Sequence, residues 1–207
     1  MLNLLFNIFI IIVFLVILFL IFWKFWFLRD PERKIPEGNV VVAPADGKVI
    51  DILDIKNPDE IKIKKGLVGK IRTLTTDVTN PHYLISIFMS PLDVHINRAP
   101  VEGEVVSIKY EKGKLLPANS LENGLLNEKN EIIIKNPKLG KIKVIQIAGI
   151  LARRIVCSVE KNQNIIKGQR IGLINLGSQV TLILPKVNLA VKKGVHVTAG
   201  ETVIAEF

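Results

Sequence analysis

Residues 141–144 read Lys-Ile-Lys-Val, so polar and apolar side chains alternate with period two. This period predicts a β-strand with one face in the core and the other in water. Similar runs recur from residue 40 onward, separated by turn pairs such as Asp46-Gly47, and glycine in such pairs marks turns. The expected strands are residues 40–42, 48–55, 84–89, 105–110, 131–134, 141–150, 154–159, 179–184 and 202–207.

No segment after residue 30 has a long helical period, so the sequence predicts a mostly β domain, a compact antiparallel sandwich or barrel. Residues 159–173 and 191–204 share a lysine-glycine cadence that resembles lipoyl-like β-hairpins. A swinging-arm carrier would need an exposed lysine at a hairpin tip with a methionine beside it. The methionines are Met1 and Met89, so a carrier is not expected.

The N-terminus has a different composition. From Leu4 to Trp23 the only polar residue is Asn7, and about 20 apolar residues are enough to span a bilayer core as a helix. A cleaved signal peptide would have a basic start, a shorter apolar stretch and small residues at a cleavage site. None is present, so we expect one retained transmembrane helix within residues 1–28 and a folded domain over residues 29–207.

Basic residues predict the orientation of this helix. None precedes it, and four lie at or just after its end: Lys24, Arg29, Arg33 and Lys34. The positive-inside rule then places residues 29–207 in the cytoplasm, and Trp23 and Trp26 suit the aromatic belt at that interface. The expected location is the cell membrane, with a single span.

The composition indicates which kinds of molecule the protein binds. The net charge is +9 and 49% of the residues are hydrophobic, which suits a folded basic domain facing anionic lipid head groups. A nucleic-acid partner is not expected, because no helix-turn-helix or basic-aromatic pattern occurs. Cys157 is the only cysteine and fits a reducing compartment. The three histidines, His82, His95 and His196, are too scattered to predict a metal site.

Three segments carry the chemical signal. Residues 43–49 read Ala-Pro-Ala-Asp-Gly-Lys-Val, residues 93–100 read Asp-Val-His-Ile-Asn-Arg-Ala-Pro, and residues 174–180 read Ile-Asn-Leu-Gly-Ser-Gln-Val. Taken singly, they indicate turns and a packed histidine. Together and in this order, over residues 30–207, they resemble the short form of the phosphatidylserine decarboxylases, which has an N-terminal hydrophobic segment. Some archaeal members are thought to act on archaetidylserine.

The resemblance implies a proenzyme that cuts itself between Gly177 and Ser178, giving chains 1–177 and 178–207. Ser178 Oγ attacks the Gly177 carbonyl, the ester breaks by β-elimination, and residue 178 loses ammonia to become a covalent pyruvoyl group. A serine hydroxyl needs a nearby base. The family pattern assigns His95 as that base and Asp46 as the acid that orients it. Gln179 departs from the long-form enzymes, which have a small hydroxyl residue there.

The implied reaction is decarboxylation of a phosphatidylserine-type membrane lipid, either phosphatidylserine or archaetidylserine, to the ethanolamine lipid. The substrate amine forms a Schiff base with the pyruvoyl group, and His95 is the expected proton donor. Neither pyridoxal phosphate nor a metal is expected. Arg98, Arg153 and Arg154 are candidates for binding the lipid phosphate. The two cleaved chains should remain a heterodimer, and further oligomerisation stays open.

Other readings of the sequence remain. His82 reads as a loop histidine, His196 as an exposed hairpin residue, and Asp93 as a carboxylate on the same strand face as His95. One alternative is a membrane-anchored, lipoyl-like β-barrel adaptor without catalysis. Another is a pyruvoyl decarboxylase of a soluble amino acid, for which the anchor would have no purpose. The intact mass separates adaptor from enzyme, because an adaptor stays one chain.

Overall fold

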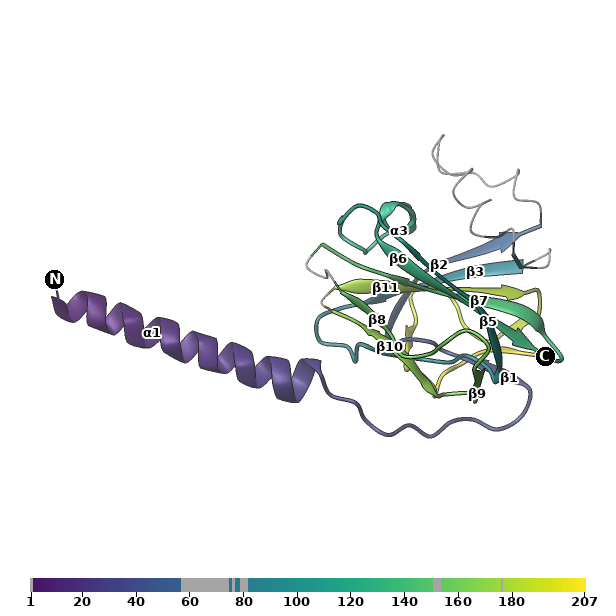
Figure 1. The fold of residues 1–207 in the computed structure, drawn as a ribbon, viewed down its shortest axis with the longest axis horizontal. Helices are drawn as coiled ribbons and strands as arrows, with labels where there is room; N and C mark the ends of the chain where they lie inside the picture. The colour runs from purple at the N-terminus through teal and green to yellow at the C-terminus, as the bar shows by residue number, and fades with distance from the viewer. Residues whose placement is uncertain (1, 57–74, 76, 79–81, 151–153, 176) are drawn as a thin grey trace.

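A computed structural model describes the chain except residues 1, 57–74, 76, 79–81, 151–153 and 176. A long N-terminal helix projects from a β domain and is joined to it by an extended linker (Figure 1). Helix α1 spans Leu2–Ile21 and contains no charged residue. The helical stretch Asn3–Phe27 is long and apolar enough to cross a membrane, so the expected N-terminal helix is present.

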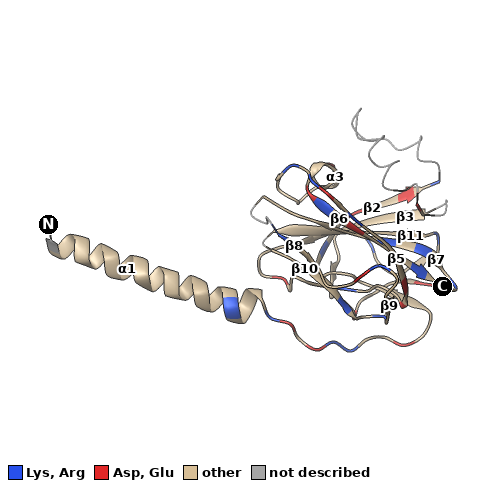
Figure 2. Ribbon diagram, in the orientation of Figure 1, with Lys and Arg blue, Asp and Glu red and all other residues tan. Residues whose placement is uncertain are grey.

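The last turns of this helix are wider than an α-helix. Element η1, Phe22–Phe27, is π-helical, and the Leu28 N–H donates to the Trp23 carbonyl five residues earlier, at 3.1 Å. Lys24 is the single blue band on the helix in Figure 2, whereas the linker that follows alternates basic and acidic residues. Phe27 is fully buried although the rest of the helix is mostly exposed. The helix end therefore packs against the β domain.

Within the described residues, the β domain has one large sheet and two small ones, and its named strands pair antiparallel. The large sheet is curled into a half-barrel with the strand order β13-β2-β3-β11-β7-β6-β5-β9. Its strands are β13 (His196–Val197), β2 (Gly47–Ile55), β3 (His82–Met89), β11 (Ser178–Pro185), β7 (Gly140–Ile147), β6 (Lys129–Asn136), β5 (Gly103–Glu111) and β9 (Asn164–Ile165). The mostly β fold that the sequence predicts is confirmed.

The small sheets contain the shorter strands. One has the order β1-β14-β12 and the other β4-β10-β8. Their bounds are β1 (Val40–Val42), β14 (Val203–Glu206), β12 (Asn188–Leu189), β4 (Ile96–Arg98), β10 (Arg170–Ile174) and β8 (Ile155–Cys157). All nine predicted runs contain a strand; β9, β13 and most of β10 lie in the two hairpin-like segments, residues 159–173 and 191–204, and β4 and β12 were not predicted. These five have at most five residues each, too few to establish a clear period.

Strand β11 lies at the centre of the large sheet, between β3 and β7. Successive side chains of a strand point to opposite faces. Val180, Leu182 and Leu184 therefore join the main core, whereas Ile183 joins a second cluster. The short helix α3 (Leu121–Leu126) contributes Leu125 to that second cluster. Both faces of β11 are covered, which explains its nearly complete burial.

The alternation at residues 141–144 is real, and the predicted wet face is exposed at Lys141 but not at Lys143. Ile142 and Val144 lie in the main core, while Lys143 points away from it and is nevertheless fully buried. Its ammonium group pairs with Glu131 at 3.0 Å and with Asp77 at 3.2 Å. Burial of a lysine becomes tolerable when its charge is paired in this way, so this face is covered at Lys143 and open to water at Lys141.

Candidate active site

Ser178 is the first residue of β11 and is fully buried. It lies opposite Met89, the last residue of β3, and its hydroxyl donates to the Met89 sulfur at 3.5 Å. A thioether is a weak acceptor. The hydroxyl is therefore held loosely, in a dry position at the end of two central strands.

The bond before Ser178 lies in tight backbone. Gly177 has φ +65, in the left-handed region that favours glycine. Its carbonyl group passes so close to Gly149 that a Cβ built on Gly149 would overlap the Gly177 carbonyl oxygen. The loop after β7 thus presses backbone against the carbonyl that the serine would attack, and only a glycine at 149 leaves the necessary space.

His95 lies in the loop between β3 and β4 and comes to the same end of the sheet. Its carbonyl accepts a hydrogen bond from Ile174 N at 3.4 Å, three residues before Gly177. The imidazole is fully buried. Its Nδ1 is 2.9 Å from the Asp93 carbonyl, while Nε2 is buried with no hydrogen-bond partner among the residues that the structure describes.

These contacts fix the proton on the His95 ring. A carbonyl oxygen can only accept, so Nδ1 carries the hydrogen and Nε2 presents its lone pair. Burial is the main cause that lowers the pKa of His95 to about 4, and the charge of Arg29 also lowers it. The hydrogen bond to the Asp93 carbonyl and the charge of Asp93 raise it. Near pH 7 the ring is neutral, with an unpaired basic nitrogen in a dry site.

Asp46 lies at the same end of the sheet, directly before β2, which pairs with β3. Its carboxylate accepts from Arg33 at 2.9 and 3.1 Å and from Ala199 N at 2.8 Å. Burial raises the pKa of Asp46, and the Ala199 N–H and Arg33 lower it. The structure brings Asp46 and Ser178 to one sheet end, but the contacts of the described residues include no Asp46–His95 hydrogen bond. Its orienting role stays a prediction.

Gln179 points to the opposite face from Ser178. With its nitrogen toward the segment before α3, its amide donates to the carbonyls of Ala118 and Ser120, each at 3.1 Å. Its oxygen then accepts from the hydroxyls of Thr181 at 3.0 Å and Ser86 at 3.2 Å. This orientation satisfies all four groups. Gln179 therefore ties the α3 segment to the outer face of β11 and lies away from the Ser178 hydroxyl.

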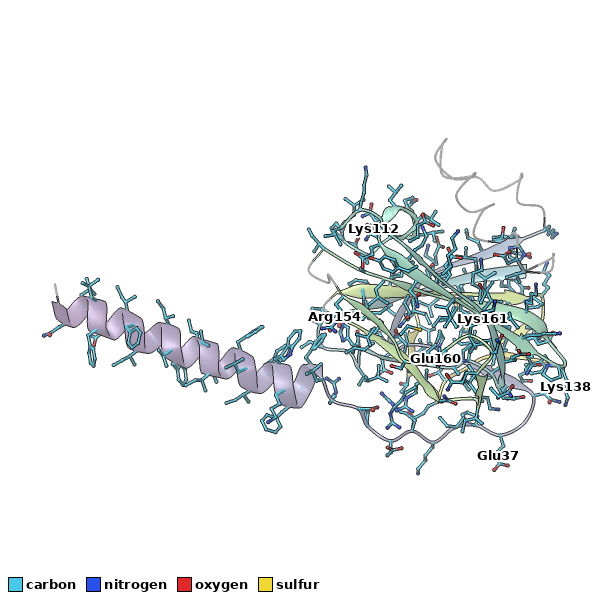
Figure 3. The ribbon with its side chains drawn as sticks, viewed as in Figure 1. Glu37, Lys112, Lys138, Arg154, Glu160 and Lys161 are labelled. Atoms are coloured by element: carbon cyan, nitrogen blue, oxygen red, sulfur yellow. The ribbon has the colours of Figure 1, made fainter. Side chains whose placement is uncertain are left out.

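The three candidate arginines have different surroundings. Arg98 is buried and donates to the Gly168 carbonyl, the Asp30 carboxylate and the Pro31 carbonyl at 3.0–3.1 Å, so its guanidinium fastens the linker. Arg154 is exposed, on the side of the β domain nearest to α1, whereas Glu37 marks the linker on another side (Figure 3). Arg153 lies outside the described residues.

Predictions for the remaining polar residues had mixed outcomes. His196 is exposed, as expected. His82 is not a loop residue: it begins β3, is fully buried, and burial lowers its pKa. Asp93 lies in a loop and not on a strand face, and its carboxylate accepts from Ser90 N at 2.7 Å. It contacts His95 through its backbone.

Two contact residues were missed by sequence reasoning. Met89 was considered only in excluding a swinging-arm carrier, and Phe27 only as part of the N-terminal segment, residues 1–28. In the structure Met89 contacts the Ser178 hydroxyl, and the Phe27 ring packs on the His95 ring with centroids 4.2 Å apart. Among the described residues, no group of three or more His, Cys, Asp or Glu side chains could hold a metal ion.

The arrangement suits a covalent group made from residue 178. The serine is buried, Gly177 adds no side chain around the carbonyl that would be attacked, and His95 Nε2 has no hydrogen-bond partner in the described part of the chain. A ketone formed at residue 178 would be in a dry position at the end of β11, where water competes poorly. The site thus fits a pyruvoyl group in that place.

Fold and site define a mostly β protein with a Gly-Ser bond at the start of a central strand, a buried serine in that bond and a neutral histidine at the same end of the sheet. Residues 20–205 match the family model described as phosphatidylserine decarboxylase. The chain therefore belongs to the phosphatidylserine decarboxylase family.

Curated relatives agree with this assignment. A phosphatidylserine decarboxylase proenzyme of Carboxydothermus hydrogenoformans is 41% identical over 136 residues, 65% of this chain and 55% of that protein. One of Chlorobium phaeobacteroides is 42% identical over 135 residues, again 65% and 55%. The "Putative archaetidylserine decarboxylase proenzyme" of Methanocaldococcus jannaschii is 41% identical over 136 residues, 65% of each chain. The aligned part spans about half the length of the first two.

Proposed function

We propose that the protein is a proenzyme that cleaves itself between Gly177 and Ser178 and then decarboxylates a phosphatidylserine-type lipid to the ethanolamine lipid. The observation that carries this proposal is the buried Ser178 hydroxyl at the end of β11, with the basic Nε2 of His95 unpaired at the same end of the sheet. Membership of the family supports the reaction class.

The first stage uses only residues of this chain. His95 Nε2 takes the Ser178 hydroxyl proton as Oγ attacks the Gly177 carbonyl carbon, and the proton passes to the nitrogen of residue 178 as the peptide C–N bond breaks. An ester then joins Gly177 to the serine oxygen. Loss of the residue 178 Cα proton and of the Cβ–O bond releases Gly177 as a carboxylate. Water replaces the nitrogen of residue 178, which leaves as ammonia.

The ketone of the resulting pyruvoyl group would accept the substrate amine and withdraw electrons as carbon dioxide leaves. His95 begins this stage without a proton on Nε2. It can take one from the substrate ammonium, which must become an amine before it reacts. The same nitrogen can return that proton to the substrate carbon after carbon dioxide has gone, so His95 ends as it began, and the amine released by hydrolysis takes its proton from water.

Other residues hold the reacting groups. Gly149 leaves room for the Gly177 carbonyl, and Asp46 adds a partly buried carboxylate at the same sheet end, held by Arg33 and Ala199. Arg154 is the exposed candidate for the lipid phosphate, and Arg153 remains a second candidate. Arg98 is occupied by the linker, and its phosphate role would require it to give up Asp30.

Two chains should remain together after cleavage. Residues 178–207 contribute β11 to the centre of the large sheet and β12, β13 and β14 elsewhere. The new ends would lie at the sheet end, while the eight-residue pairing of β11 with β3 stays intact. We infer a heterodimer, anchored in the cell membrane by residues 1–28, with the domain of residues 29–207 on the cytoplasmic side near anionic lipid.

A lipid assay on the purified protein tests this function. Vesicles that contain phosphatidylserine, archaetidylserine or neither are incubated with the protein, and the ethanolamine lipid is measured. We expect product from at least one serine lipid and none from free serine. Turnover of free serine alone would favour decarboxylation of a soluble amino acid. A single uncut chain without product would favour the membrane-anchored adaptor.

A further inference from the structure

The end of the apolar helix touches the histidine of the site. The Phe27 ring lies over the His95 ring with centroids 4.2 Å apart and planes inclined by 39°. On its other side Phe27 stacks on Trp23, with centroids 4.6 Å apart and planes inclined by 15°. Neighbouring Phe25 is 70% exposed, whereas Phe27 is fully buried. Only one of these two phenylalanines contributes to the site.

A second contact fixes the same junction. The Leu92 carbonyl, in the loop that carries His95, accepts from Trp26 Nε1 at 3.3 Å and from the Arg29 guanidinium at 2.7 Å. Arg29 also lies over the Trp26 ring, 4.6 Å from its centroid. The helix end is therefore bound to both the side chain and the backbone of the His95 loop.

The linker beyond the helix is also fastened. Arg33 pairs with Asp46 at 2.9 Å, and Asp30 pairs with Arg98 at 3.0 Å and with Arg170. Most of these pairs are partly buried, so they are screened less than pairs at the surface. Phe27 is thus held in place from both of its ends, which makes its contact with His95 a fixed feature of the fold.

We propose that Phe27 is a positioning residue for His95: the aromatic end of the apolar helix covers one face of the imidazole, excludes water from it and fixes its orientation. The proposal rests on the function proposed for His95. It makes the last turn of the helix a part of the active site and gives the helix a task besides membrane attachment.

The physical reason is desolvation. Charging an imidazole is unfavourable where water cannot reach it, and burial is the main cause of the low His95 pKa, about 4. The charged groups that act on the ring are Asp93 in its own loop, which raises the pKa, and Arg29 in the linker, which lowers it. Opening the Phe27 side to water should move the pKa back toward the ordinary value.

The test measures His95 directly in the full-length protein. Histidine-labelled protein is kept as one chain by Ser178→Ala and placed in lipid nanodiscs, and the three imidazoles are titrated by NMR. His95 is assigned through His95→Gln. Phe27→Ala is compared with Phe27→Leu, which keeps apolar volume without the ring, and with the exposed control Phe25→Ala. Exposed His196 reports that the conditions are unchanged.

We expect Phe27→Ala to raise the His95 pKa by roughly 1 unit or more, Phe27→Leu to raise it less, and Phe25→Ala to leave it unchanged. An unchanged His95 titration in folded Phe27→Ala overturns the proposal. So does an equal shift in Phe25→Ala. If Phe27→Ala fails to fold, Phe27→Leu decides: a raised pKa supports the proposal and an unchanged one overturns it.

The pH profile of self-cleavage gives a second readout with Ser178 intact. The rate should be flat down to about pH 5 in the parent protein, and in Phe27→Ala it should fall about tenfold per unit below the raised pKa. Failure of the proposed function is visible separately, because His95→Ala would then cleave normally. The titration does not depend on cleavage, so the two failures are distinguishable.

Discussion

The two halves of the site are held in different ways. Ser178 is positioned by the sheet: β11 pairs on one side with β3 over eight residues and on the other with β7. His95 is positioned by a loop that contacts the helix end through the Phe27 ring, the Trp26 N–H and the Arg29 guanidinium. One half depends on backbone pairing and the other on a few side chains.

This difference has a chemical consequence. The proposed nucleophile is built into a central strand and cannot move without loss of the sheet, whereas the environment of the proposed base depends on contacts that single substitutions remove. We therefore expect substitutions at Ser178 to abolish self-cleavage and decarboxylation completely, and substitutions around His95 to slow these reactions to different extents. The predictions below test that contrast, from the largest effect to the smallest.

Ser178→Ala should abolish both self-cleavage and decarboxylation, because alanine offers no nucleophile and cannot become a ketone. The protein should still fold, since residue 178 makes its strand pairing through the backbone. Denaturing electrophoresis and the lipid assay measure the two losses. Ser86→Ala, which removes another fully buried hydroxyl on the neighbouring strand β3, is the matched control and should cleave. Cleavage in Ser178→Ala would exclude Ser178 as the nucleophile.

His95→Ala should slow self-cleavage by about 10²- to 10⁴-fold, the usual contribution of a general base. A slow reaction still reaches completion over hours, so some mature enzyme should accumulate. Its activity per mature chain decides the second role of His95: a reduced value indicates the proton carrier described above, and a full value limits His95 to maturation. His196→Ala, at an exposed histidine, is the control. Normal cleavage in His95→Ala would leave the base unassigned.

Gly149→Ala should slow cleavage by about 10²-fold, because its Cβ would displace the Gly177 carbonyl and a shift of about 1 Å has a cost of that size. The time course of cleavage, followed by mass, gives the rate, and circular dichroism checks the fold. A variant that folds and cleaves at the parent rate would show that the close approach of these two backbones does not matter for the reaction.

Asp46→Asn should have the smallest effect, about tenfold or less on cleavage. Its contacts are with Arg33 and Ala199, so the substitution should reach His95 only through the packing of the linker. Melting temperature should fall, because Arg33 loses a charged partner. Slowing that approaches about 10⁴-fold, the cost of altering the orienting carboxylate of serine triads, would show that Asp46 turns to His95 during the reaction.

The sequence predicted the strands well, because alternating runs between turn residues record the two faces of a sheet directly. It failed at Lys143 for a physical reason: alternation separates two faces but does not say what covers each. Here Glu131 and Asp77, which are distant in sequence, pair with the lysine. His82 was missed as a strand residue because the run that follows it shows its period only from Leu84 onward.

The candidate site was predicted through the order of its motifs, which identifies residue types but not contacts. Nothing in that order pairs Asp46 with Arg33, since the two meet only after the linker folds back along the domain. Phe27 was missed because an apolar run of this composition has no signal for the one aromatic ring that turns toward the domain. Such pairings depend on tertiary structure and had to be read from it.

The central claim is that the bond between Gly177 and Ser178 breaks by the action of this chain alone. The direct measurement is the intact mass of the full-length protein, purified and incubated without other proteins. We expect two chains, 1–177 and 178–207, the smaller lighter by one ammonia than simple hydrolysis would give and without a free amino terminus. A single chain of unchanged mass, or a smaller chain that begins with an intact serine, would contradict it.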